Sequence, residues 1–209
     1  METFAHSGKW ILLGSILLLV FGCSTSPPSD VNDICTIFVE KKGWYADAAD
    51  STKEWGSSIP VMMAMMHQES KFKATAKPPR KKVFGFIPGS RPSDAYGYSQ
   101  ALGATWDGYK RSAGRYGADR DDFGDAIDFI GWYNHQSYKR SGIKKTDSYR
   151  LYLAYHEGHG GYNRATYRNK SWLINVARKV DKKASSYRKQ LLTCEGNLNK
   201  DEAWFFGLF

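Results

Sequence analysis

One segment of this 209-residue chain restricts the possible folds more than any other, the apolar run Val61-Met62-Met63-Ala64-Met65-Met66. Pro60 stands directly before the run and suits the first turn of a helix, where a missing N–H breaks no hydrogen bond. A helix that is hydrophobic on all sides has to be enclosed by other elements, so the run predicts a central, buried helix. Glu69 and Ser70 follow within one turn and carry a carboxyl group to the edge of the core.

The other periodic segments also have the helical period. Two further stretches carry apolar or buried-type residues in helical register, the first opened by Asp121 and Asp122: Phe123, Ile127, Ile130 and Asn134, then Leu173, Ala177 and Val180. We find no convincing strand alternation and no internal repeat. Hydrophobic residues make up 42% of the sequence, enough for one sizeable core, so we expect a single all-α domain over residues 31–198.

The N-terminal segment has the pattern of an export signal. Lys9 precedes an apolar run, Trp10 to Gly22, that is short for a membrane span and gives way at once to polar residues. The run ends in Leu19-Val20-Phe21-Gly22-Cys23, which resembles a bacterial lipobox. We therefore expect a lipoprotein signal peptide over residues 1–22 and lipidation of Cys23, with an ordinary signal peptide cut near Ser24 as the alternative.

This interpretation predicts a location and a disulfide. Residues 23–30 would tether the domain to the periplasmic face of the cell envelope, and Ser24 favours the outer membrane. Three cysteines are an odd count for an exported protein. Lipidation of Cys23 leaves Cys35 and Cys194 as a pair, which we expect to be bonded in an oxidising compartment, two buried thiols being the alternative.

Three segments depart from the helical pattern. Residues 76–98 contain four prolines, three glycines and the basic run Arg80-Lys81-Lys82, which is the composition of a loop. The glycines of residues 158–161 (GHGG) are expected to end the helix that passes through Tyr155. Residues 199–209 form an apolar tail that we expect to pack back on the domain.

Glu69 is the clearest candidate for a catalytic residue. A carboxyl group in apolar surroundings has a raised pKa and stays protonated near neutral pH. Cleavage of a glycosidic bond needs such a group to protonate the leaving oxygen. The alternative is a solvated helix-end glutamate paired with Lys71 or Lys73.

Three short segments follow one another in the chain: His67-Gln68-Glu69-Ser70-Lys71-Phe72, Gly97-Tyr98-Ser99-Gln100, and Ala154-Tyr155-His156-Glu157-Gly158. Together they resemble the lytic transglycosylases of the soluble type, over roughly residues 55–185. The resemblance implies a goose-lysozyme-like helical domain with a substrate cleft, and peptidoglycan glycan strands as the substrate.

The resemblance also implies roles at the matching positions. Glu69 would be the single general acid and base, and Ser70 would support the fold or the hydrogen bonds of the acid. Gln100 would contact the sugar near the scissile bond. The hydroxyl of Tyr155 would lie close to the catalytic carboxyl group.

The chain departs from the family pattern at two of the three segments. Tyr98-Ser99 replaces Leu-Met, and Tyr98 would then stack on a sugar. His156-Glu157 replaces Asn-Ala, which would place both side chains on the substrate side. Glu157 would alternatively be a loop residue paired with an arginine, Arg164 or Arg168.

The mechanism that the resemblance implies uses one carboxylate. Glu69 protonates the glycosidic oxygen, the N-acetyl group of the sugar stabilises the cationic centre, and Glu69 then deprotonates the 6-hydroxyl to give a 1,6-anhydro product. A lysozyme-like hydrolase that uses Glu69 with Glu157 is one alternative, because hydrolases ordinarily need two carboxylates. A catalytically inactive peptidoglycan-binding lipoprotein is the other.

The charge balance points to an anionic partner. Thirty basic residues stand against twenty-one acidic ones, a net charge of +9. The basic loop with Arg91 either draws an anionic glycan strand toward the cleft or faces anionic lipid head groups. We expect no nucleic acid partner, because no recognised motif is present and export argues against one. The domain is expected to be a monomer.

A zinc enzyme is the remaining alternative. His67, His156, Glu157 and His159 are residue types that bind zinc. Their spacing is not that of the His-Glu-x-x-His helix of metalloproteases, so we expect neither a metal nor another cofactor.

Overall fold

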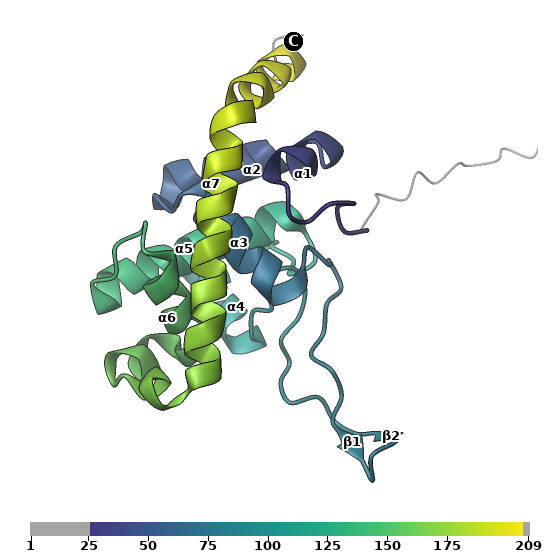
Figure 1. Ribbon diagram of the computed structural model, residues 1–209, viewed down its shortest axis with the longest axis vertical. Coiled ribbons are helices and arrows are strands. Elements are labelled where there is room, and N and C mark those ends of the chain that lie inside the picture. The colour runs from purple at the N-terminus through teal and green to yellow at the C-terminus, as the bar shows by residue number, and fades with distance from the viewer. Residues whose placement is uncertain (1–25, 207–209) are drawn as a thin grey trace, which may run out of the picture.

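The computed structural model describes residues 26–206, with side chains described as far as Leu198 except for that of Val83. This part of the chain is helical almost throughout, which confirms the predicted all-α class (Figure 1). The elements are α1 (Ile34–Glu40), α2 (Trp44–Trp55), α3 (Ile59–Ser70), β1 (Lys82–Val83), β2 (Ile87–Pro88), α4 (Gly103–Ala113), α5 (Phe123–Ser141), α6 (Ser148–Asn163), the 3-10 helix η1 (Thr166–Asn169) and α7 (Ser171–Phe206). The expected signal peptide and the lipidation of Cys23 lie outside the described residues.

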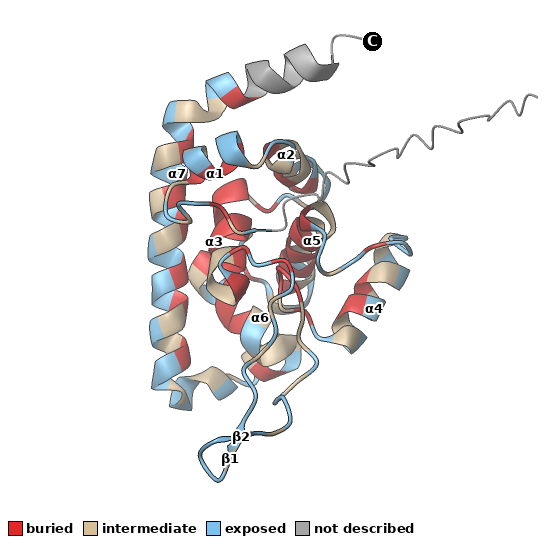
Figure 2. Ribbon diagram, turned by 90° about the vertical axis from the view of Figure 1, so that its right-hand side faces the viewer, coloured by how far each residue is buried: buried red, intermediate tan, exposed pale blue. Residues whose placement is uncertain are grey.

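The predicted central helix is α3. Every residue from Ile59 to Met66 is buried, and α2, α5, α6 and α7 all pack against it. Figure 2 shows α3 as a red helix between α7 and α5. The helix ends at Ser70 and is capped by Lys71, which takes a left-handed conformation (φ 51°) and donates its backbone N–H to the carbonyl of His67. Glu69 therefore lies in the last turn of the most buried helix.

The helices around α3 follow the predicted register. The side chain of Asp122 caps α5 by accepting the backbone N–H of Asp125, and Phe123, Ile127, Ile130 and Asn134 are all buried. On α7, Leu173, Ala177 and Val180 are buried as expected. Within residues 26–206, no helix is both long enough and hydrophobic enough to cross a bilayer.

The prediction that glycines 158–161 end a helix was only half right. The backbone breaks at Gly158, which has φ 70° and ψ 157°, but α6 resumes there and continues to Asn163. Gly160 and Gly161 therefore lie in helical conformation. A single glycine is enough for the break, because this φ is open to glycine at no steric cost.

Residues 76–98 form an extension that we call the arm, and it contains a hairpin that the sequence pattern did not predict. Strands β1 and β2 pair antiparallel, with Lys82 opposite Pro88. At the base of the arm, the Gly97 N–H donates to the Ala76 carbonyl at 3.0 Å. Gly97 has φ 77°, and a Cβ there would lie 1.9 Å from the Arg120 carbonyl oxygen. This position therefore requires glycine.

A disulfide between Cys35 and Cys194 joins α1 to α7, as predicted. Every apolar residue of the described core lies between Ile34 and Leu198. A chain that starts at Ser24 therefore keeps all of the core that the structure describes. The packing expected of the tail, residues 199–209, lies outside the described side chains.

Removing the disulfide by Cys35→Ser together with Cys194→Ser should lower the free energy of unfolding by about 2–5 kcal/mol. The reason is that the two cysteines are 159 residues apart, so their bond restricts the unfolded chain strongly. Urea denaturation measures the effect, and the wild type under reducing conditions should match the double variant. Equal unfolding free energies for the oxidised and the reduced wild type would contradict this prediction.

Candidate active site

Glu69 is held in an environment that makes its carboxyl group an acid near neutral pH. Desolvation by burial raises its pKa to about 7, and a hydrogen bond from the Tyr152 hydroxyl opposes this rise without cancelling it. The residue nevertheless keeps part of its surface exposed. A carboxyl group with such a pKa is able both to donate and to accept a proton at pH 7.

The alternative of a solvated, paired glutamate does not describe Glu69. Lys71 and Lys73 are both exposed, and neither forms an ion pair with Glu69 in the described part of the chain. The partner of the carboxyl group is instead the neutral hydroxyl of Tyr152 on α6.

Two tyrosines of α6 line the side of Glu69. Tyr152 and Tyr155 are three residues apart and therefore share a helix face. The Tyr155 hydroxyl donates to the Ser99 carbonyl at 2.6 Å. Burial, followed by the nearby Glu69 carboxylate, raises the pKa of both tyrosines well above the ordinary value, so both remain protonated donors.

Tyr152 is the site residue that sequence reasoning missed. The hydrophobic period assigns it to the core, where it does lie, with 4% of its surface exposed. The available signal was its spacing of three residues from Tyr155, which places both hydroxyl groups on one face.

The side chains of Ser70 and Gln100 both bond to backbone carbonyls. The Ser70 hydroxyl donates to the Met66 carbonyl at 3.3 Å, within its own helix. The Gln100 side-chain amide donates to the carbonyls of Ala76 and Gly97, at 2.9 Å each, and so closes the base of the arm. Gln100 is partly exposed.

Tyr98 lies in the core and not at a surface where a sugar would stack. Only 4% of it is exposed, and its ring packs edge-on against Trp44 and Phe123, at 5.6 and 5.9 Å between centroids. The sugar-stacking role expected of Tyr98 is therefore corrected: the large ring that replaces a smaller family residue fills space between α2 and α5.

Glu157 is fully engaged in an ion pair. Its carboxylate accepts from Lys170 at 2.7 Å and from Thr166, and the His156 ring nitrogen lies 3.2 Å away. Desolvation alone raises the pKa of Glu157, but these hydrogen bonds together lower it to about 2. Successive helix residues are turned by about 100°, so Glu157 points away from the face that carries Tyr155.

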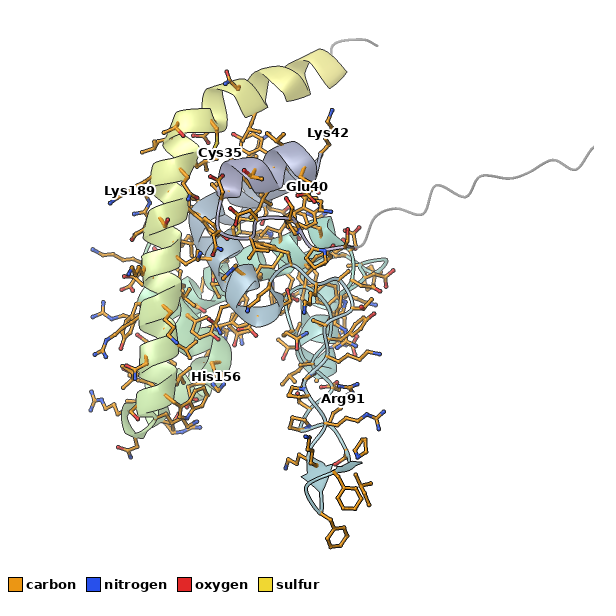
Figure 3. The ribbon with its side chains drawn as sticks, turned by 45° about the vertical axis from the view of Figure 1, so that its right-hand side comes forward. Cys35, Glu40, Lys42, Arg91, His156 and Lys189 are labelled. Atoms are coloured by element: carbon orange, nitrogen blue, oxygen red, sulfur yellow. A yellow bond between two sulfur atoms is a disulfide. The ribbon has the colours of Figure 1, made fainter. Side chains whose placement is uncertain are left out.

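His156 is four residues after Tyr152 and therefore lies on the same face of α6. Its ring is exposed and contacts the exposed Trp172 edge-on, with 5.0 Å between centroids. Figure 3 shows His156 and Arg91 of the arm on two separate limbs of the molecule.

The other histidines occupy unrelated environments. Burial, followed by the charges of Lys183 and Lys71, lowers the pKa of His67 to about 4, so this ring is neutral. His159 stacks on Tyr133, at 4.6 Å between centroids, and bonds to Ser137. Among the described residues, no group of three or more His, Cys, Asp or Glu side chains is placed to hold a metal ion.

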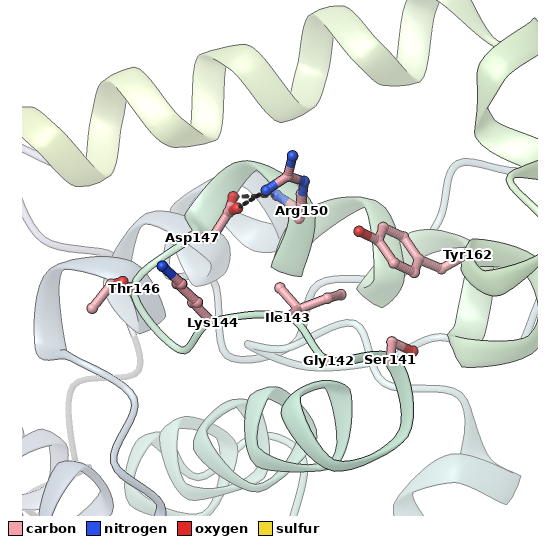
Figure 4. Close-up of a pocket in the computed structure, with 8 residues that line it drawn as sticks. All are labelled: Ser141, Gly142, Ile143, Lys144, Thr146, Asp147, Arg150 and Tyr162. Carbon is pink, nitrogen blue, oxygen red and sulfur yellow. Dashed lines mark hydrogen bonds and ion pairs between the residues drawn. The ribbon is translucent and has the colours of Figure 1, made fainter.

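A pocket of about 530 Å³ lies away from Glu69 (Figure 4). It is lined by the connection between α5 and α6 together with Arg150 and Tyr162 of α6. Arg150 is paired with Asp147, three residues earlier, at 2.9 Å, and both line this pocket. The residues that surround Glu69 do not line it.

The chain was compared with protein families, curated proteins and solved structures. The family model described as "Transglycosylase SLT domain" matches residues 11–194, which is most of the chain. No curated protein and no solved structure matches. The matched range contains Glu69, Tyr152, Tyr155 and the disulfide. With this match over a helical domain built around a buried acidic helix end, the chain belongs to the transglycosylase SLT domain family.

Proposed function

We propose that this protein is a peptidoglycan lytic transglycosylase. It would cleave the MurNAc–GlcNAc glycosidic bond without water and leave 1,6-anhydro-MurNAc ends, with Glu69 as the single general acid and base. The observation that carries the proposal is the pKa of Glu69, raised to about 7 in the last turn of the buried helix of an SLT domain.

In the first step, the Glu69 carboxyl group gives its proton to the glycosidic oxygen as the bond from that oxygen to C1 breaks. The carbonyl oxygen of the N-acetyl group bonds to C1 and takes up the positive charge. Glu69 is left as a carboxylate, which the hydrogen bond from Tyr152 stabilises.

In the second step, the Glu69 carboxylate removes the proton of the 6-hydroxyl group. The oxygen of that group bonds to C1, and the N-acetyl oxygen leaves. The carboxyl group is protonated again, so the cycle closes with no water consumed. A pKa near 7 suits both steps, because one group has to act as acid and then as base.

The contacts of Glu157 favour this one-carboxylate route over a lysozyme-like hydrolase. A second catalytic carboxylate needs to face the same bond as the first. Glu157 is directed to Lys170 and Thr166, and only 3% of its side chain is exposed. We propose that it fixes the end of α6, and that exposed His156 and partly exposed Gln100 contact the glycan strand.

We also propose that a lipid on Cys23 holds the mature protein at the periplasmic face of the outer membrane. The support for this is the lipobox-like sequence, with Ser24 after the cysteine. Residues 24–33 separate Cys23 from the start of α1, so the proposed tether would be short.

Glu69→Gln should abolish the release of fragments from purified sacculi by residues 24–209, a loss of about 10²-fold or more, because the amide cannot transfer a proton. Mass spectrometry identifies the products: the wild type should give anhydro-ended fragments. Fragments heavier by one water would indicate a hydrolase. Intact binding to sacculi with no release by the wild type would favour the inactive binding lipoprotein.

The same variant should remain folded. The pKa of Glu69 is raised from 4.5 to about 7, so the stability that its protonated form provides is complete below pH 4.5 and is lost as the pH rises through 7. Glu69→Gln should therefore be more stable than the wild type at pH 8, by about 1–3 kcal/mol. Thermal unfolding of both proteins below pH 4.5 and at pH 8 measures the difference.

Tyr152→Phe should move the alkaline limb of the pH profile to higher pH. The Tyr152 hydroxyl favours the charged carboxylate. Its removal therefore raises the pKa of Glu69 further and keeps the acid protonated up to a higher pH. Rates of release between pH 5 and 9 test this, with Tyr162→Phe as the matched control on the same helix. An alkaline limb at an unchanged pH would contradict the role given to Tyr152.

Glu157→Gln should keep the anhydro products but lower the free energy of unfolding by about 1–3 kcal/mol at neutral pH, since Lys170 loses its charged partner. The pKa of Glu157 is about 2, so this difference should be present above pH 4.5 and shrink as the pH falls toward 2. Loss of all products by this variant, while it is still folded, would revive the hydrolase with two carboxylates.

A further inference from the structure

The tip of the arm exposes large hydrophobic side chains that contribute nothing to the core. Phe84 is 84% exposed, Phe86 is 76% exposed and Ile87 is 45% exposed. They occupy the turn and the second strand of one hairpin, so they form a single apolar tip at the far end of the arm (Figure 3). Neighbouring exposed aromatic residues of this kind commonly mark an interaction site.

From Lys77 to Arg91 the charged side chains of the arm are all basic, and its one acidic residue, Asp94, lies near its base. Arg80, Lys81 and Lys82 lead into the hairpin and Arg91 leaves it, while no acidic residue occurs between Glu69 and Asp94. The partner of the arm therefore has to carry anionic groups for the basic side chains and, beside them, an apolar region that covers the tip.

The arm is held in shape by internal contacts. The Lys81 N–H donates to the Ser90 carbonyl at 3.1 Å, and the Gly89 N–H donates to the Lys81 carbonyl at 2.7 Å. The Arg91 guanidinium donates to the Pro78 carbonyl. Phe84 and Gly85 both have positive φ, 52° and 80°, in the turn that presents the tip.

We propose that the arm docks on a bilayer that contains anionic phospholipid. Phe84 and Phe86 enter the interface between head groups and acyl chains, and Arg80, Lys81 and Lys82 lie among the phosphates. Aromatic rings and basic chains are the residues that settle at this boundary. A hydrated glycan strand supplies anionic groups but no apolar interior to cover three hydrophobic side chains.

The placement of the arm fits this partner. In Figure 1 the start of the described chain and the arm both lie on the right-hand side of the molecule. The inference stands on the arm itself and not on the lipid proposed for Cys23, so it is testable on protein without that lipid.

The test is flotation of residues 24–209 with vesicles of phosphatidylethanolamine and phosphatidylglycerol, and with vesicles of phosphatidylcholine alone. The wild type should float with the anionic vesicles only, and added salt should release it. Arg80→Gln with Lys81→Gln and Lys82→Gln should weaken binding on the order of a hundredfold. Phe84→Ser with Phe86→Ser should weaken it about tenfold or more.

Matched controls separate the arm from general charge and hydrophobicity. Arg178→Gln with Lys179→Gln and Lys182→Gln removes the same charge from exposed positions of α7, and Leu192→Ser removes an equally exposed apolar side chain. Both controls should float almost as the wild type does. Flotation of the arm variants at the wild-type level, or equal binding to phosphatidylcholine, would overturn the proposal.

A glycan partner is distinguished in the same series. The arm variants should release fragments from lipid-free sacculi as fast as the wild type, which keeps this inference separate from the proposed function. No flotation of the wild type would overturn the inference, and loss of sacculus binding by the arm variants would then assign the arm to the glycan strand.

Discussion

The burial of α3 on every side is the constraint from which the rest of the structure follows. A helix with no polar face needs neighbours all round, and α2, α5, α6 and α7 supply them. The position of the carboxyl group is a result of the same packing. Because the apolar run stops three residues before Glu69, the side chain lies where the core ends and water is only partly excluded.

Two glutamates of this protein show how strongly the partners of a carboxylate set its proton affinity. Glu69 has a phenol for its partner and holds its proton up to a pH of about 7. Glu157 is also shielded from water, but a lysine and a hydroxyl group keep it charged down to a pH of about 2. Burial is common to both, so the difference lies in the charge and the donors that surround each group.

Features that depend on local periodicity were predictable from the sequence. Residue spacing predicted the central helix, the Asp122 cap and the buried row Leu173, Ala177 and Val180 on α7. The disulfide followed from the odd number of cysteines, with Cys23 set aside for lipidation. The hairpin was not predictable, because two residues per strand are too few to show alternation. Tyr98 was misjudged because its contacts, with Trp44 and Phe123, come from elements distant in the sequence, which periodicity does not report. Tyr152 was overlooked, although its spacing from Tyr155 places both on one helix face.

α7 is synthesised after the other described helices, and its packing completes the enclosure of α3. α3 is made in the first third of the chain, yet one of its faces stays open to water until α7 has been added and joined to α1 through Cys35 and Cys194. The desolvated surroundings that raise the pKa of Glu69 therefore do not exist on a partly completed chain. The catalytic property proposed here would arise last, as a product of the finished fold and not of the helix that carries the residue.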